Sequence, residues 1–530
     1  MTLRERGPDV VALLLCLAAL VVGWRFSTRV AGGADSYGYI SQGLLLADGR
    51  FGPQPPILSA APWKDATATL APLGYRPSVD GHSVVPVYPP GLPLLFAAAH
   101  RFGGMPALFA VVPICGALAL AFAYLLARSF LKPWPSILVP LLLASFPAFL
   151  HQLFQPMSDV PVTAAWLAVL VGVIRSIRGM RGGGSAKGLL AAGLAASIAV
   201  LIRPNLAPLT ALPALFLAWT APAGSRLRAV ALFSVGVLPG AATLAGFNAV
   251  WYGSPIASGY GSFDELFGAE HILPNLRNYL SWWCTQHTPF LLLGLPLLLV
   301  PFRRLVERSA QLLLGSFAIG TLGLYLAYGE FSDATYLRFL LPMVAPLAIL
   351  VLAGTERWLP GPGYRTLLIG LALYAAAFGF RRSWEFGSFD LAASEHRYVE
   401  VADYAKRFLE PRAVFVAMQH AGSLRFYADR TTVRWDCLAP RGFDRALAWL
   451  EASGRPVYFA LESWEIEELG QKFPDSRYRA FDWTPVADVG GVRFYRPQSF
   501  VSLRAGRETL DRRRPSSHPR PAVPRSGRPG

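Results

Sequence analysis

The sequence contains a long series of apolar segments, each close to the length that crosses a membrane. A helix needs about 20 apolar residues to span the hydrocarbon core, and only 15% of the 530 residues are charged, against 53% hydrophobic. Soluble domains carry about 25% charged residues. The chain is therefore predicted to be an α-helical polytopic membrane protein with about eleven transmembrane helices, at residues 8–28, 105–128, 135–152, 160–178, 187–203, 205–220, 229–250, 289–302, 310–328, 338–354 and 366–380.

The basic residues predict the orientation of these spans. The formal net charge is +16, and much of it lies in alternate connections, which is the pattern of cytoplasmic loops. Arg381 and Arg382 are an exception. We expect a multi-pass protein of the inner or plasma membrane with a cytoplasmic N-terminus and an extracytoplasmic C-terminal part. Residues 1–28 could also be read as a signal peptide, but the many later spans favour an uncleaved first helix. No motif supports nucleic-acid binding.

The first predicted outer loop, residues 29–104, holds the most informative polar residues. Asp35, Tyr39 and Gln42 have the spacing i, i+4 and i+7, which places them on one face of a helix. A carboxylate held on a helix among hydrogen-bonding side chains, such as those of Tyr37 and Tyr39, is suited to act as a general base. The alternative is a helix N-cap, because Asp is a preferred capping residue and the sequence Gly-Gly-Ala-Asp-Ser is typical of a helix start.

The order of short motifs resembles the membrane-embedded GT-C superfamily of glycosyltransferases. These motifs are an Asp shortly after the first span (Asp35), a Pro-Pro segment late in the same loop (Tyr88-Pro89-Pro90) and an acid in the next outer loop (Asp159). The chain is similar in layout to the dolichyl- or polyprenyl-phosphate-mannose protein mannosyltransferases, which makes it glycosyltransferase family 39-like. It is also similar to the lipid A aminoarabinose transferases. The resemblance implies that Asp35 is the catalytic acidic residue.

The resemblance also implies the reaction. A sugar would pass from a polyprenyl-phosphate donor to a hydroxyl of a cell-envelope lipid, glycan or protein, with inversion at the anomeric carbon. We expect no cofactor, and the need for a divalent cation stays open because the sequence shows no spacing of metal ligands. In the aminoarabinose transferases an acid and a lysine precede the Pro-Pro pair, whereas this chain has Val87 and Tyr88 there. Either the donor phosphate is then bound by other residues, with Arg203, Arg338, Lys64 and His82 as candidates, or the donor geometry differs.

Two arginines at the outer ends of spans are candidates for that role. Arg203 ends one apolar segment and Arg338 begins another. A charge at the edge of the hydrocarbon is costly, so it usually has a partner. The alternatives are a clamp on the lipid-linked phosphate or a structural role, by snorkelling or by pairing with Asp159 or Asp333. The predicted substrate-binding residues are Tyr37, Tyr39, Tyr88, Pro89, Pro90, Asp159, Arg203 and Arg338.

After residue 380 the sequence changes to that of a soluble domain. Alternating amphipathic and buried segments between 392 and 497 predict a small α/β domain, following a transmembrane catalytic domain at 1–380. The turn Gln419–Ser423 after the first predicted strand would be a ligand-binding loop or an ordinary helix start. Residues 503–530 contain eight arginines among Pro, Ser and Gly and predict a disordered basic tail.

Two functions from different classes fit these features. One is the transferase, and the other is a transporter or flippase of lipid-linked sugars that does no covalent chemistry. Transporters usually show paired halves and interrupted helices at the membrane midplane. Here the two halves differ, and the polar residues collect at one surface, which favours the transferase.

Overall fold

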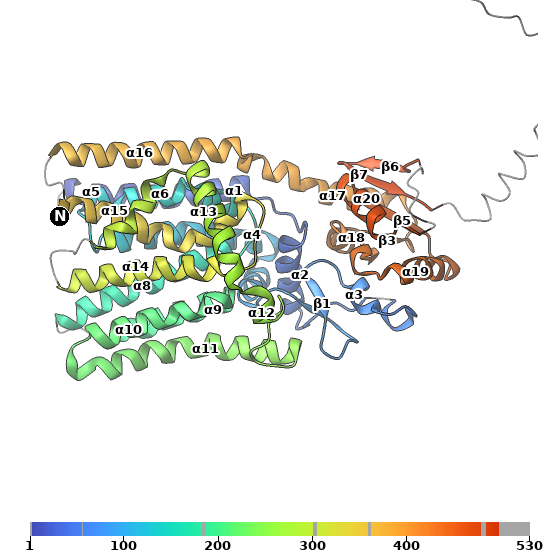
Figure 1. Ribbon diagram of the computed structural model, residues 1–530, viewed down its shortest axis with the longest axis horizontal. Helices are drawn as coiled ribbons and strands as arrows, with labels where there is room; N and C mark the ends of the chain where they lie inside the picture. The colour runs from blue at the N-terminus through green and yellow to red at the C-terminus, as the bar shows by residue number, and fades with distance from the viewer. Residues whose placement is uncertain are drawn as a thin grey trace, which may run out of the picture.

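The computed structural model describes residues 3–55, 57–182, 186–299, 305–358, 362–476, 478 and 484–497. It consists of a helical bundle and a smaller α/β part at one end of the bundle (Figure 1). The predicted basic tail at 503–530 lies outside the described residues.

Over its described residues, every predicted span coincides with helical structure in the bundle, as expected for apolar segments whose backbone groups must be paired within the segment. The elements are α1 (Leu3–Phe26), α4 (Gly91–Ala127), α5 (Pro133–Ser136), α6 (Leu138–Ala144), α7 (Pro147–Leu153), α8 (Asp159–Arg181), α9 (Lys187–Ile202), η2 (Pro204–Thr210), α10 (Ala211–Thr220), α11 (Arg226–Tyr252), η5 (Pro289–Gly294), η6 (Pro296–Leu299), α14 (Leu305–Leu326), α15 (Leu341–Trp358) and α16 (Pro362–Glu385). Six described helices are long and apolar enough to cross a membrane alone, and a bent pair would make a seventh.

Proline and glycine explain where the spans break. The bent pair turns by 67° between Pro133–Ala144 and Pro147–Leu153. Phe146, before Pro147, has extended backbone (ψ 122°), because proline disfavours helical angles in the residue before it. In α4 the backbone is non-helical at Gly103 and Gly104, so the membrane-spanning part begins close to the predicted residue 105.

The first loop folds at the end of the bundle, between the bundle and the C-terminal part (Figure 1). Its elements are α2 (Asp35–Ala47), η1 (Leu58–Ala60), α3 (Ala66–Leu70) and an antiparallel hairpin of β1 (Tyr75–Pro77) and β2 (Val84–Pro86). Later connections add η3 (Ala223–Ser225), α12 (Phe263–Leu266), η4 (Ala269–His271), α13 (Ile272–Gln286) and η7 (Ala334–Leu340).

The C-terminal part is the α/β unit that the sequence predicts. It contains η8 (Ser388–Asp390), α17 (Leu391–Phe408), β3 (Val414–Val416), α18 (Ala421–Ala428), β4 (Thr431–Val433), η9 (Trp435–Cys437), α19 (Pro440–Ala452), β5 (Val457–Glu462), α20 (Ser463–Lys472), β6 (Ala487–Val489) and β7 (Val492–Tyr495). The sheet order is β4-β3-β5-β7-β6. β3 is parallel to β4 and β5, whereas β7 is antiparallel to β5 and β6.

One face of this sheet packs against the first loop. Ile57, Trp63 and Leu70 are buried in the same apolar cluster as Val414 and Val433 of the sheet. A backbone hydrogen bond joins the two segments, from Arg434 N to Thr69 O at 2.7 Å. The first loop therefore belongs to the core of the C-terminal part as well as to the end of the bundle.

Candidate active site

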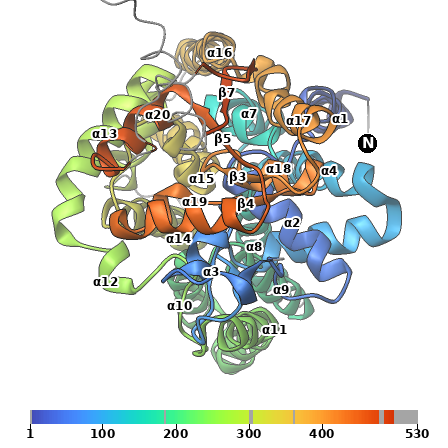
Figure 2. The ribbon, with the colours of Figure 1, turned by 90° about the vertical axis from the view of Figure 1, so that its right-hand side faces the viewer.

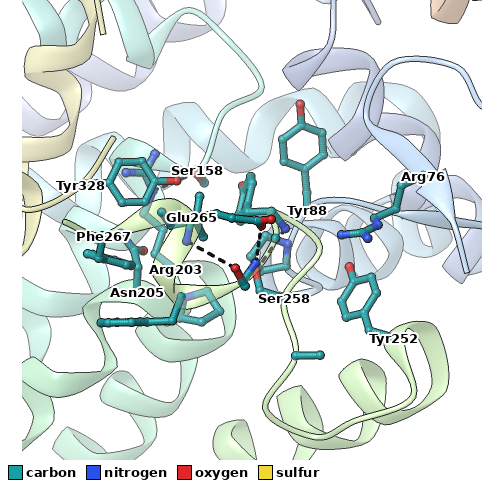
Figure 3. A pocket seen from close by; sticks show the side chains of 18 of the residues that line it. Arg76, Tyr88, Ser158, Arg203, Asn205, Tyr252, Ser258, Glu265, Phe267 and Tyr328 are labelled. Atoms are coloured by element: carbon teal, nitrogen blue, oxygen red, sulfur yellow. Dashed lines mark hydrogen bonds between the residues drawn. The ribbon is translucent and has the colours of Figure 1, made fainter. Parts of the chain in front are cut away.

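A large pocket opens where the first loop meets the ends of the spans. Its volume is about 1020 Å³. It is lined by residues of α2 and the β1–β2 hairpin, by Met157–Asp159 and Ile202–Asn205, by the loop after α11, and by residues of α14 and η7. Figure 3 shows Arg203 and Ser158 on one side of the pocket and Arg76 and Tyr252 on the other.

Asp35 is the first residue of α2 and faces this pocket. The N-cap of the helix is Ala34, and no side chain caps it, so the capping alternative is wrong. The carboxylate instead accepts a hydrogen bond from Tyr88 Oη at 2.6 Å and one from Arg338 Nη2 at 3.3 Å. The Asp35 side chain is 34% exposed. It is thus fixed in orientation by two partners and remains accessible from the pocket.

Tyr88 acts on Asp35 as a hydrogen-bond donor. Burial, and next the nearby charge of Asp35, raise the pKa of Tyr88 well above its ordinary value, so the hydroxyl keeps its proton. Its ring lies 4.5 Å from that of Tyr39. Burial and the charge of Asp35 also raise the pKa of Tyr39 to about 12. Both phenols are therefore neutral donors beside the carboxylate at any physiological pH.

A second acid–arginine pair lies next to the first. Arg203 donates from Nη2 to Asp159 Oδ1 at 2.6 Å, from Nη1 to Tyr325 Oη at 2.9 Å and from Nε to Ser158 Oγ at 3.2 Å. Tyr39 donates to the same Ser158 hydroxyl at 3.1 Å. The Asp159 side chain is 0% exposed, and its Oδ2 has no hydrogen-bond partner in the described structure. The predicted pairing of Arg203 with Asp159 is present.

Arg338 is less fully engaged than Arg203. It pairs only with Asp35 among the described residues, and its buried Nε atom has no hydrogen-bond partner there. The guanidinium carbons of Arg338 and Arg203 lie 5.4 and 4.8 Å from the centre of the Phe339 ring. Cation–π attraction to this ring stabilises both charges. Asp333, the other predicted partner, instead accepts from Thr335 N at the start of η7.

The comparisons with known proteins agree with this architecture. Residues 88–251 match the family model for dolichyl-phosphate-mannose-protein mannosyltransferase. The fold is similar to ArnT from Cupriavidus metallidurans bound to undecaprenyl phosphate, with TM-score 0.56 and 15% identity over 94% of this chain and 99% of that one. The family match and the shared fold support a membrane protein of the GT-C type.

A second GT-C structure shares the fold. It is the oligosaccharyltransferase AglB from Archaeoglobus fulgidus in complex with an inhibitory peptide and a dolichol-phosphate, with TM-score 0.52 and 13% identity over 92% of this chain and 74% of that one. No curated protein matches the chain significantly in sequence. At these identities the likeness concerns the fold, so the roles of residues in this chain must be argued from its own geometry.

The pocket gathers most of the residues that the sequence singled out. Asp35, Tyr39, Tyr88, Pro89, Asp159, Arg203 and Arg338 all line it. Pro90 and Tyr37 are not among the lining residues. Tyr37 is buried on another side of α2, where it packs against Phe426 of α18. Two residues along a helix differ by about 200° in direction, so Tyr37 cannot share the face of Asp35 and Tyr39. The geometry gives no support to substrate binding by Tyr37.

Several lining residues are not among the site residues that the sequence predicts. Tyr325, Tyr328, Tyr336 and Phe339 form an aromatic wall beside the arginines. Aromatic residues at the ends of spans are usually interfacial anchors, which concealed this role. The loop after α11 also contributes, and its Gly259 O accepts from Arg76 at 3.0 Å. Within the described ranges, no group of His, Cys, Asp and Glu side chains could hold a metal ion, and the expectation on divalent cations stays a prediction.

Proposed function

We propose that this protein transfers a hexose or pentose from a polyprenyl phosphate to a hydroxyl of a cell-envelope lipid, glycan or protein. The observation that carries the proposal is the contact of an accessible carboxylate, Asp35, with an incompletely paired arginine, Arg338, in a pocket at the end of an apolar bundle. The matched mannosyltransferase family supports it, as do the two fold neighbours, whose structures contain undecaprenyl phosphate and dolichol-phosphate.

Arg338 is the better candidate for the donor phosphate. Arg203 already makes three hydrogen bonds to side chains of the pocket wall. Among the described residues Arg338 makes one, to Asp35, and its buried Nε has no partner there. A guanidinium group binds phosphate oxygens with two parallel hydrogen bonds. A donor phosphate would thus satisfy Arg338 and withdraw it from Asp35.

Asp35 would then serve as the general base. The acceptor oxygen forms its bond to the anomeric carbon while the bond from that carbon to the phosphate oxygen breaks. The hydroxyl proton passes to Asp35, and polyprenyl phosphate leaves with the bonding electrons. A single displacement of this kind inverts the anomeric configuration. Because Arg338 contacts the Asp35 carboxylate until a phosphate takes its place, the donor is expected to bind before the acceptor.

Asp159 and Arg203 would shape the sugar site. Arg203 holds one oxygen of Asp159, and the other oxygen is buried without a partner in the described chain. An unpaired buried acceptor is costly, and a sugar hydroxyl would satisfy it. Tyr39, linked to this pair through Ser158, would fix the same wall.

The test is transfer in proteoliposomes that contain the purified protein and a panel of radiolabelled hexosyl and pentosyl polyprenyl phosphates. Labelled product should appear together with free polyprenyl phosphate in equal amounts. The anomeric configuration of the product should be opposite to that of the donor. Transport of an intact lipid-linked sugar without cleavage, in a protein that gives no product with any acceptor fraction, would instead identify a flippase.

A further inference from the structure

The sheet of the C-terminal part has an edge of the kind that binds ligands in α/β folds. The first strand, β3, pairs on one side with the second, β4, and on the other with the third, β5, all in parallel. The strand order reverses at β3, and ligands of such sheets bind outside the carboxyl ends of the strands at this switch point. Here the switch point lies between the residues after β3, Met418–His420, and the end of β5 at Glu462.

Buried polar groups make this edge rigid. Glu465, 0% exposed, accepts hydrogen bonds from Met418 N and Gln419 N at 3.1 and 3.2 Å and from Trp435 Nε1 at 3.1 Å. His420 Nε2 lies 3.1 Å from Glu462 Oε1. The loop after β3 is thus held by side chains from several elements, as a binding site requires.

The chain's own segment before α2 fills the edge. Tyr398 of α17 lies with its ring 4.7 Å from that of His420, and Gln419 Nε2 donates to its hydroxyl at 2.6 Å. Gly32 packs directly against this ring, so that a Cβ there would collide with it. Gly33 follows with a φ of +56°, a left-handed angle that favours glycine. Ala31 N donates to Tyr427 Oη of α18 at 2.8 Å.

The C-terminal part also contacts the first turn of α2, on the side away from the pocket. Figures 1 and 2 place α18 beside α2. Tyr37 packs so closely on Gly422 of α18 that a Cβ on this glycine would collide with the ring. Tyr37 N donates to Gly32 O at 3.1 Å, which ties the turn to the segment before it. Asp35 lies between these two points of attachment.

We infer that the C-terminal α/β part is a positioning module for Asp35, which binds the segment Ala31–Gly33 at its switch-point edge and so fixes the start of α2. Gly32, Tyr398 and Gly422 are the positioning residues at this contact. The inference rests on the proposed function, since it assigns the module's effect to the general base. A shift of about 1 Å in a catalytic group costs up to about 100-fold in rate.

The experiment uses Gly32→Ala and Gly422→Ala. The added Cβ would collide with Tyr398 of the module in the first variant and with Tyr37 of α2 in the second. Gly442→Ala is the control, because no atom lies within 4 Å of a Cβ there and Gly442 belongs to α19 of the same module. In the purified full-length protein, hydrogen–deuterium exchange of the Tyr37 and Gly38 amides should become at least about tenfold faster in both variants. It should keep the parental rate in Gly442→Ala.

Kinetics then separate positioning from a general structural role. Both variants should lose about 10–100-fold in kcat, while the KM for the donor changes by less than about twofold. The milder Tyr427→Phe, which removes the acceptor of the Ala31 amide, should show the same pattern with a smaller loss. Parental exchange and kcat in Gly32→Ala and Gly422→Ala, or a donor KM that rises as much as kcat falls, would overturn the inference. If the parental protein transfers no sugar, the proposed function fails, and the exchange measurement still shows whether the module holds α2.

Discussion

The replacement of Asp35 by Asn tests the central assignment, because it removes the base and keeps the shape. The oxygen of Asn accepts the hydrogen bond from Tyr88, which Asp35 accepts at 2.6 Å. The helix start is unaffected, since Asp35 makes no capping bond. Loss of a general base lowers the rate by about 10²–10⁴-fold, or about 3–5 kcal/mol in the activation free energy at 1.36 kcal/mol per factor of ten. We expect kcat to fall by at least about 100-fold.

Asp35→Asn should lower the free energy of unfolding modestly, and it should not weaken donor binding. Arg338 loses its anionic partner, and leaving a charged donor in a mostly buried place costs about 1–3 kcal/mol of unfolding free energy. For the donor, however, the carboxylate competes with phosphate for Arg338. The donor KM should therefore stay constant or decrease in Asp35→Asn. A loss of donor affinity would contradict the shared use of Arg338.

The assay compares Asp35→Asn with a matched control in the same purified preparation. Asp48→Asn is suitable, because Asp48 ends the same helix, is exposed and pairs only with exposed Arg50 in the described structure. It should keep parental kcat within about twofold, as surface pairs contribute 0–1 kcal/mol. Normal turnover by folded Asp35→Asn protein would refute the assignment of the base, and Asp159→Asn would be the next variant to measure.

Arg338→Ala should raise the donor KM more than Arg203→Ala does, whereas Arg203→Ala should mainly lower thermal stability, because it leaves Asp159 buried and unpaired at a cost of about 3–5 kcal/mol. Initial rates and thermal unfolding measure the two effects, with Arg50→Ala as the control, and equal donor KM values in all three variants would exclude the phosphate clamp. Tyr88→Phe should lower kcat about tenfold at constant donor KM, since it removes one hydrogen bond that orients the base; a full rate in this variant would leave Tyr88 with a packing role only. A reporter that fluoresces only in the cytoplasm, fused after residue 497, should stay dark, because the eleven spans predicted from the sequence, an odd number, would place the C-terminal part outside. A bright fusion would also place the pocket on the cytoplasmic side, since α2 and β1, whose residues line the pocket, lie at the same end of the bundle as the C-terminal part (Figure 1).

The sequence predicts the parts of this fold that depend on neighbouring residues. The long apolar segments of the bundle form helices, because a helix pairs the polar groups of the backbone within the segment itself. The 3.6-residue period places Asp35 and Tyr39 on one face, and both line the pocket. The same period places Tyr37 on a different face of the helix, so its closeness to Asp35 in the sequence does not bring it into the pocket.

Contacts between distant residues are the part that one sequence does not determine. Arg338 reaches Asp35 across 303 positions of the chain and Arg203 reaches Tyr325 across 122. Such pairs depend on how helices pack, which neither composition nor period reports. The aromatic wall could not be predicted from the sequence for a related reason. Tyr325 and Phe339 stack at 4.7 Å, although each looks like an ordinary interfacial residue when it is read alone.

The pocket carries two acids and two arginines in contact, so their charges cancel before any substrate arrives. Taking a single charge out of water costs several kcal/mol, and pairing offsets this cost. A donor phosphate would add one negative charge to this site. Proton transfer from the neutral acceptor hydroxyl would leave the net charge unchanged, because Asp35 loses the negative charge that the departing polyprenyl phosphate gains when its bond to the sugar breaks. The reaction would therefore move negative charge from Asp35 to the phosphate, beside Arg338. Two ion pairs beside an aromatic wall are thus suited to hold a charged lipid head and to stabilise the charge that develops on it.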